Sequence, residues 1–314
     1  MRTGVSYMGH HNPRHMRTDL ADMKSISLDD VLLAAQENDF VWMTGKVEFL
    51  PEIAREQGIR PIVIFWGVLN LFGGGRSSQF LLDNPSGHQA AKDGSWRPAG
   101  CYNNPICVAR IQEMIDRVAE LGYEGYFVDE PAPLDCYCDS CKSLYEEMVG
   151  GDLDAAADET LHRFRRDAAY RYVERISNYV KSNHPRMETM CCVWPWEPEL
   201  LTWTTEIRSL DNCGTDIYWV NEERNVEEMT PLIRRLADAC RKHGKKHNEW
   251  LQAWDVRGGN EQRITDQGEI LIREQPDALY VWAYLGQVGT SERCDDPERA
   301  WSHARNILLK AKGL

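Results

Sequence analysis

The stretch "NPICVARIQEMIDRVAELGYEGYFVDE", residues 104–130, contains the signals of a helix and of the strand that follows it. Asn104 is a typical N-cap residue, and proline is favoured at the next position, the first of a helix. Gly122 is typical of a helix C-terminus, and the apolar run Tyr123 to Asp129 has the length of a strand. Between the two ends, apolar residues recur at spacings of three and four and form one face: Ile111, Met114, Ile115, Val118 and Leu121.

The same strand and helix unit recurs along the chain. Helix-like segments, such as "MTPLIRRLADACRKHG" at 229–244, separate eight short apolar runs: Gly4 to Met8, Asp30 to Glu37, Arg60 to Trp66, Tyr123 to Asp129, Met187 to Trp194, Gly214 to Val220, His247 to Trp254 and Ala278 to Leu285. Eight alternations without a linker predict an α/β fold, a (β/α)8 TIM barrel, as a single domain over residues 1–314. A doubly wound open sheet is the alternative, but the sequence lacks the G-x-G-x-x-G turn expected of it.

Composition narrows the classes of function. The chain has 314 residues, of which 42% are hydrophobic and 27% charged, as is typical of a soluble globular protein. Its formal net charge of −13 disfavours nucleic acid and anionic membranes as partners. No apolar stretch has membrane-spanning length, and the first residues lack the apolar core of a signal peptide. Ten cysteines in a chain of this length are not a disulfide scaffold, so we expect a cytoplasmic location.

Two long segments follow predicted strands on the face where such barrels carry their active sites. Residues 67–100 include "LFGGGRSSQF", and the second segment runs from Pro131 to about Thr160. Long connections in a compact domain are usually either functional or disordered, and we favour the functional interpretation. We therefore expect each of them to form a lid or a pocket wall.

A carboxylate ends the fourth predicted strand. Glu130 follows Asp129, and strand alternation places Glu130 on the same face as Tyr126 and Val128. At the mouth of a barrel, such a carboxyl group is a candidate general acid. A solvated carboxylate or a helix cap is the alternative interpretation.

Glycoside hydrolysis requires a second carboxyl group. Asp216 and Glu37 are the best candidates, since Glu37 closes the second predicted strand. Asp216 and Tyr218 point into the barrel if Ile217 and Trp219 face the helices. Glu197 and Asp255 lie just beyond other strand ends and rank lower.

Aromatic residues gather at the other strand ends. Sugar rings have apolar faces that stack on indole rings, so an aromatic mouth with carboxylates favours a carbohydrate ligand. The alternative for each aromatic residue is packing in the core. The residues that we expect to contact substrate are Asp129, Trp66, Trp194, Tyr218, Trp219, Gln252, Trp254, Tyr284 and His10.

Three cysteines follow Glu130 in a C-x-C-x2-C pattern. Cys136, Cys138 and Cys141 provide three soft ligands within six residues, and four thiolates form a closed structural zinc site. The fourth ligand must come from elsewhere in the chain, and Cys101 and Cys107 are both available. Such a zinc ion would hold the segment that follows Glu130, and we expect no organic cofactor.

Residues 100–147 resemble the family 42 β-galactosidases. The resemblance is carried by "CYNNP" at 101–105, by "VDE" at 128–130 and by "CYCDSCKSLYEE" at 136–147. Those enzymes are retaining (β/α)8 glycosidases with a zinc-binding cysteine cluster beside the acid/base residue. The resemblance implies the acid/base role for Glu130 and zinc binding by Cys101, Cys136, Cys138 and Cys141.

Two departures from that family indicate a distinct family of barrels. Asp129 stands where those enzymes have Asn, and Gln252 stands where their nucleophilic Glu ends the seventh strand. Glu249, three residues earlier, has the wrong parity and depth to replace it. The predicted function is hydrolysis of a small or oligosaccharide glycoside, and a homo-oligomer is compatible with it. The alternatives are a carbohydrate-binding barrel without catalysis and another sugar-active barrel enzyme, an isomerase or aldolase.

Overall fold

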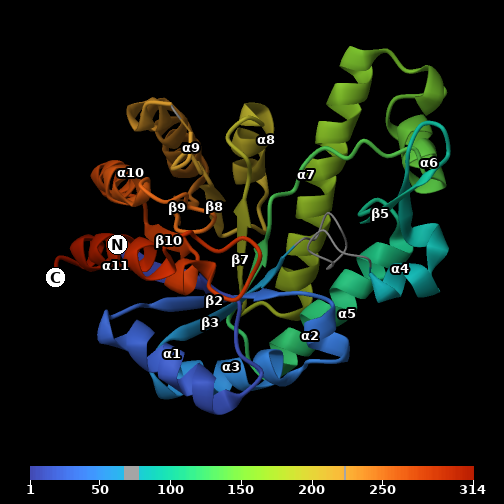
Figure 1. The fold of residues 1–314 in the computed structure, drawn as a ribbon. Helices are drawn as coiled ribbons and strands as arrows, with labels where there is room; N and C mark the ends of the chain where they lie inside the picture. Colours follow the sequence, from blue (N-terminus) through green and yellow to red (C-terminus); the bar gives the residue numbers. More distant parts are fainter. Residues whose placement is uncertain (67–77, 223) are drawn as a thin grey trace.

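The computed structural model describes residues 1–66, 78–222 and 224–314. Its central feature is a closed barrel of eight parallel strands in the order β1-β10-β9-β8-β7-β6-β3-β2 (Figure 1). The barrel strands are β1 (Arg2–Tyr7), β2 (Asp30–Ala35), β3 (Arg60–Phe65), β6 (Gly125–Val128), β7 (Glu188–Cys192), β8 (Asn212–Thr215), β9 (Lys246–Gln252) and β10 (Ala278–Trp282). Each of the eight predicted runs overlaps one of these strands, which confirms the (β/α)8 fold.

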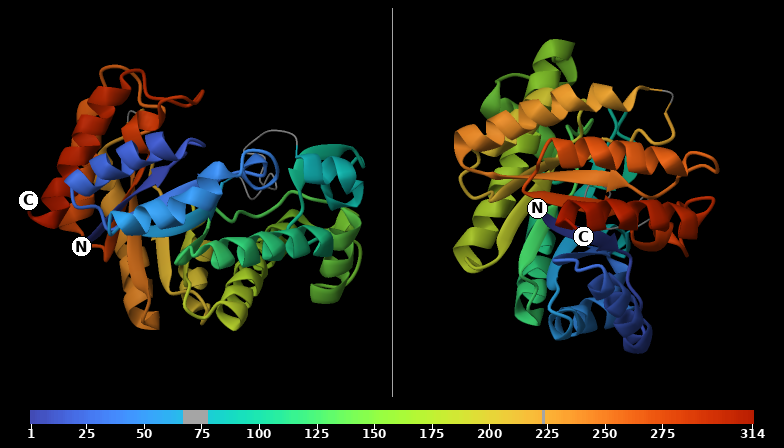
Figure 2. Two further views of the ribbon diagram at one scale, coloured as in Figure 1. Left: turned by 90° about the horizontal axis from the view of Figure 1, so that it is seen from below. Right: turned by 90° about the vertical axis from the view of Figure 1, so that its left-hand side faces the viewer.

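Helices surround the barrel, and the first and last strands are neighbours. The pairing of β1 with β10 closes the sheet, and the two chain ends lie near each other (Figure 2). The helices are α1 (Pro13–Ser25), α2 (Asn38–Val41), α3 (Gly45–Glu56), α4 (Gln79–Asp83), α5 (Pro105–Leu121), α6 (Asp139–Met148), α7 (Asp158–Asn183), α8 (Pro198–Trp203), α9 (Thr230–His243), α10 (Glu261–Arg273) and α11 (Pro297–Lys312). Among the described residues, no helix is both long and apolar enough to cross a membrane.

Local signals set the helix ends as predicted. The Asn104 side chain accepts a hydrogen bond from the Ile106 amide at 3.0 Å and caps α5. Gly122 ends this helix with a φ of +91°, and Gly244 ends α9 with a φ of +66°. Glycine adopts this left-handed conformation without steric cost, which explains why both helices end there.

Strand side chains alternate between two cores. One core fills the barrel interior with residues that include Leu32, Ile64, Phe127, Met190, Trp250 and Tyr280. Their sequence neighbours on the strands point outward and pack beneath the helices, as do Val63, Tyr126 and Leu251. This alternation decides which side chains at the strand ends can reach the barrel mouth.

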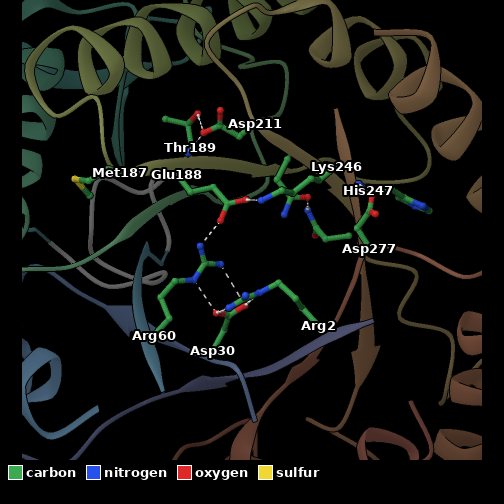
Figure 3. Close-up of polar contacts among 12 residues, drawn as sticks. Arg2, Asp30, Arg60, Met187, Glu188, Thr189, Asp211, Lys246, His247 and Asp277 are labelled. Atoms are coloured by element: carbon green, nitrogen blue, oxygen red, sulfur yellow. Dashed lines mark hydrogen bonds and ion pairs between the residues drawn. The ribbon is translucent and has the colours of Figure 1, made fainter. Parts of the chain in front are cut away.

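Charged residues close the N-terminal end of the barrel (Figure 3). Asp30, which is fully buried, accepts hydrogen bonds from Arg2 Nη2 at 2.5 Å and from Arg60 Nε at 2.8 Å. Arg60 also pairs with Glu188, which in turn lies 2.9 Å from Lys246 Nζ. These ion pairs thus join the starts of five barrel strands: β1, β2, β3, β7 and β9.

The two segments that we expected to be long loops contain regular structure. Residues 78–100 form α4 and a hairpin of β4 (His88–Ala90) and β5 (Trp96–Gly100), whereas residues 67–77, which include Arg76, lie outside the described residues. The segment after Glu130 contains α6 and the start of α7. Figures 1 and 2 show α4 and α6 on one side of the barrel, beside the outer half of α7. The helical periodicity that begins at Asp139 accounts for α6 in the second segment.

Candidate active site

The ends of β6 and β8 bring three carboxyl groups together. Asp129 and Glu130 directly follow β6, and Asp216 directly follows β8. The Asp216 side chain is only 3% exposed, shares a hydrogen bond with Glu130 and lies within the field of Asp129. Its Oδ1 atom has no hydrogen-bond partner within the described part of the chain. We call Asp129, Glu130 and Asp216 the carboxyl cluster.

The electrostatics of the carboxyl cluster favour a protonated Asp216. Burial raises the pKa of Asp216 well above its ordinary value, and the charge of Glu130 and the hydrogen bond with it add to this effect. Burial also raises the pKa of Tyr218 and of the Cys192 thiol, with a further contribution from Asp216. A carboxyl group that holds a proton beside a second carboxyl group is the usual basis of acid–base chemistry in an enzyme site.

A turn, and not strand alternation, carries Glu130 to Asp216. Our expectation that Glu130 shares an inward face with Tyr126 and Val128 was wrong, because both residues pack outward beneath the helices. The strand ends at Val128, and Glu130 has a positive φ of +40°, which redirects the chain. A conformation of this kind in a residue other than glycine is often found at functional sites.

The parity prediction for the end of β8 is confirmed. Ile217 and Trp219 pack in the outer core, whereas Tyr218 packs against the core of the barrel interior. Asp216 and Tyr218 therefore lie on the inner side, as the alternation predicted.

Aromatic side chains lie at or just after the C-terminal ends of β3, β7, β8, β9 and β10. Tyr218 contacts Trp254 edge to face with ring centroids 5.7 Å apart, and the buried Trp254 Nε1 has no hydrogen-bond partner among the described residues. Trp66 lies 5.8 Å from Trp282, and the Trp194 ring lies 4.9 Å from that of Trp196, which is 62% exposed. These rings offer apolar faces beside unpaired polar atoms, a combination that suits a sugar ring with its hydroxyl groups.

Other predicted site residues have partners away from the carboxyl cluster. Glu37 is buried, and its Oε1 accepts a hydrogen bond from the Phe80 amide at 2.7 Å. Trp219 is covered by the Arg224 guanidinium at 3.8 Å from its ring centroid. Tyr284 packs edge to face on Tyr7 and Trp301, and its hydroxyl donates to Asp22. The structure therefore does not bring Glu37, Trp219 or Tyr284 to Asp216.

His10 follows β1 and is exposed to solvent. Its Nε2 lies 3.4 Å from Asp19 of α1, and its ring meets His15 edge to face. No contact in the described residues joins it to the carboxyl cluster.

Gln252 has a structural role at the end of β9. Its Oε1 accepts a hydrogen bond from the Val220 amide at 3.0 Å, and its Nε2 donates to the Trp254 carbonyl at 3.2 Å. An amide serves this donor and acceptor at once, which a carboxylate cannot do. Glu249 faces outward, as predicted, and pairs with His247 at 2.5 Å.

Two inward residues at strand ends were not among the predicted substrate contacts. Cys192 ends β7 on the inner face and influences Asp216 through a hydrogen bond. Trp282 ends β10, and its Nε1 donates to Gln287 at 2.8 Å. The sequence does carry a signal for both, because alternation places each on the inward face of a predicted run, 187–194 or 278–285.

Four buried cysteines converge beyond the carboxyl cluster. The sulfur atoms of Cys101, Cys136, Cys138 and Cys141 all lie within 4.8 Å of one another, and the Cys101 and Cys141 sulfurs are 3.5 Å apart. Zinc–sulfur bonds of about 2.3 Å in a tetrahedron place sulfurs about 3.8 Å apart, so the donors fit a metal ion. Cys107 instead lies beside the Gly87 carbonyl, which identifies Cys101 as the fourth member.

The fold and this site define a (β/α)8 barrel with an acidic, aromatic-walled centre at the C-terminal strand ends. The fold is similar to that of a β-galactosidase from the Antarctic haloarchaeon Halorubrum lacusprofundi, with a TM-score of 0.77 and 15% identity over 100% of this chain and 58% of that one. It is also similar to an endo-1,4-β-mannanase from Rhizomucor miehei, with a TM-score of 0.66 and 14% identity over 98% of this chain and 95% of that one.

A putative α-L-fucosidase from Bacteroides thetaiotaomicron has a TM-score of 0.59 and 10% identity, over 98% of this chain and 92% of that one. This chain thus spans little more than half of the β-galactosidase and nearly all of the other two. At these identities the likeness defines the fold. No known protein family and no curated protein matches the sequence.

Proposed function

We infer that this chain is a glycoside hydrolase that acts as one catalytic domain. Glu130 and Asp216 would donate the proton to the leaving group and take a proton back from water. The observation that carries this proposal is the contact between the buried Asp216 and the more exposed Glu130 at the strand ends. The aromatic rings at the neighbouring strand ends and the similarity of the fold to glycosidases support it.

The two carboxyl groups would act together on one proton. Glu130 is the more accessible member, so it presents the proton to the glycosidic oxygen while the bond to the sugar carbon breaks. The negative charge left on the pair stabilises the positive charge of the sugar. A water molecule then adds through its oxygen to the anomeric carbon and returns a proton to the pair, which completes the hydrolysis.

We propose that the four cysteines hold a zinc ion. When bound, zinc would supply structural cross-linking, because four thiolates leave it no open position for a substrate. Asn103 Nδ2 lies 3.4 Å from the Cys141 sulfur and would support that thiolate.

A carbohydrate-binding barrel without catalysis is the second candidate. It is favoured by Gln252, whose amide is fully engaged with backbone groups where related barrels carry a nucleophile. Such a protein would bind sugars equally well with and without a carboxyl group at position 130.

Sugar release separates the two candidates. The protein and its Glu130→Gln variant are incubated with a panel of aryl glycosides and natural oligosaccharides. We expect release by the parent and a loss of about 100-fold or more in the variant on substrates with poor leaving groups. Sugar binding by calorimetry, with no release by either protein, would contradict hydrolysis and support the binding candidate.

A further inference from the structure

The segment between Glu130 and the cysteines lacks regular secondary structure. Residues 131–138 form neither helix nor strand, yet most of them are buried. Glu130 begins this segment in a left-handed conformation, so its side chain depends on how the following residues are held. The contacts of residues 131–138 therefore bear on the geometry of the proposed acid.

Tyr102 holds this segment close to Glu130. Its hydroxyl donates a hydrogen bond of 2.8 Å to the carbonyl of Ala132, two residues after Glu130. Tyr102 is buried and directly follows Cys101, a member of the cysteine group. One short stretch of chain thus contacts both the metal-ligating set and the backbone beside the acid.

The ring of Tyr102 is itself held in place. It stacks on Tyr172 of α7 with centroids 4.6 Å apart and an interplanar angle of 19°. Tyr172 and Tyr126 of β6 are both fully buried next to each other, and their hydroxyls lack hydrogen-bond partners of good geometry in the described chain. Packing therefore fixes the direction in which the Tyr102 hydroxyl points.

The far end of the segment has separate supports. Asp135 pairs with Arg97 at 2.6 Å and also with Arg165, and the Tyr137 amide donates to the Ala90 carbonyl at 2.8 Å. These contacts lie near the cysteines. Of the contacts described here, the one made by Tyr102 lies nearest to Glu130 in the chain.

We propose that Tyr102 is a positioning residue that couples the four-cysteine centre to the placement of Glu130. This inference rests on the proposed function. A metal ion bound by Cys101 would hold Tyr102, and Tyr102 would hold the Ala132 carbonyl and with it the turn at Glu130. Its hydroxyl takes no proton from the substrate and acts only through the backbone.

The test uses Tyr102→Phe, which removes the hydroxyl and keeps the stacked ring. Tyr145→Phe is the matched control, because Tyr145 is a buried tyrosine of α6 that packs on Phe164. Amide hydrogen exchange is measured on peptides covering 128–136, and metal content is measured in both variants. We expect faster exchange of 128–136 in Tyr102→Phe only, at unchanged metal content.

The dependence of kcat on the leaving group distinguishes a misplaced acid from a general loss of active structure. Aryl glycosides with very good leaving groups need little proton donation, whereas poor leaving groups depend on it. We expect Tyr102→Phe to lower kcat about 10-fold on poor leaving groups and to change it little on dinitrophenyl glycosides. Tyr145→Phe should match the parent on both substrates.

Unchanged exchange of 128–136 in Tyr102→Phe would overturn the inference whatever the activity. An equal loss on both classes of leaving group, or a loss of metal from this variant, would also overturn it. Absence of sugar release by the parent would count against the proposed function instead, and hydrogen exchange alone would then decide whether Tyr102 holds the segment.

Discussion

Asp216 is a buried acid whose charge the fold does not stabilise. Burial and the neighbouring Glu130 raise its pKa, so the folded state binds its proton more tightly than the unfolded state does. Its favourable contribution to stability is therefore complete below the unfolded pKa of about 3.8 and is lost as the pH rises through the folded pKa. Destabilising charge of this kind is typical of functional sites.

Asp216→Asn should therefore abolish sugar release and stabilise the protein above neutral pH, by about 1 kcal/mol. Urea unfolding between pH 4 and pH 9 measures this, and the parent should lose stability with rising pH more steeply than the variant. Parallel curves for the two proteins would contradict the protonation of Asp216. The same substitution at the exposed Asp255, which also follows a strand, is the control.

Gln252 provides a second prediction at the scale of one residue. Gln252→Glu keeps an acceptor for the Val220 amide but places an oxygen against the Trp254 carbonyl. We expect a loss of about 1–3 kcal/mol in the free energy of unfolding, because one buried polar group loses its partner. Sugar release should not increase, and a clear gain in activity would show instead that position 252 is a nucleophile site.

At the scale of elements, the positions of the segment after β6 and of helices α6 and α7 depend on contacts between residues that are far apart in the chain. Cys101 precedes α5, whereas the other three cysteines lie between β6 and the first turn of α6. A metal ion would thus join two elements that hydrogen bonds of the barrel do not connect. The contribution of this metal cross-link to local stability can be measured separately from activity.

Cys136→Ser should reduce metal content from about one ion per chain to near zero and expose residues 131–157 to limited proteolysis. Cys107→Ser is the control, since Cys107 is equally buried but lies outside the group of four. Chelation of the parent should reproduce the proteolysis pattern of Cys136→Ser. Cleavage that begins instead within the barrel strands would contradict a local role for the metal.

At the scale of the whole molecule, one end of the barrel holds a network of ion pairs and the other end holds the candidate active site. The ion pairs of Asp30, Arg60 and Glu188 join the strand starts (Figure 3). The carboxyl cluster lies at the opposite ends of the strands. Burial opposes the ionisation of Glu188, but the charges of Arg60 and Lys246 outweigh it and lower the pKa of Glu188. The stability due to Glu188 is therefore present above its unfolded pKa of 4.5 and is lost as the pH falls.

Arg60→Met leaves Asp30 and Glu188 buried without their shared partner. We expect a loss of about 3–5 kcal/mol at neutral pH and a smaller loss in acid, because protonation of Glu188 removes the charge that Arg60 stabilises. Sugar release per folded molecule should be unchanged, because the network is remote from the carboxyl cluster. Arg241→Met, on the exposed surface of α9, should change stability by less than about 0.5 kcal/mol. An equal effect of both variants would contradict the role given to Arg60.

The order of elements was predictable because it depends on local signals. The apolar runs, the cap at Asn104 and the glycines at 122 and 244 lie within a few residues of the features that they determine. The cysteine spacing and the carboxylate at the end of β6 are equally local. For these reasons the sequence alone predicted the barrel, Glu130 as a candidate acid and a four-cysteine group that includes Cys136.

The assembly of the site was decided by the tertiary structure. A positive φ at Glu130 and the packing of Tyr126 and Val128 beneath the helices were not encoded in any short pattern. The contact of Glu130 with Asp216 joins residues that are tens of positions apart. Spacing alone left Cys101 and Cys107 open, and the structure confirms the grouping with Cys101 that the family resemblance implied. Local pattern determines which elements form, whereas barrel closure and side-chain packing determine which of their ends meet.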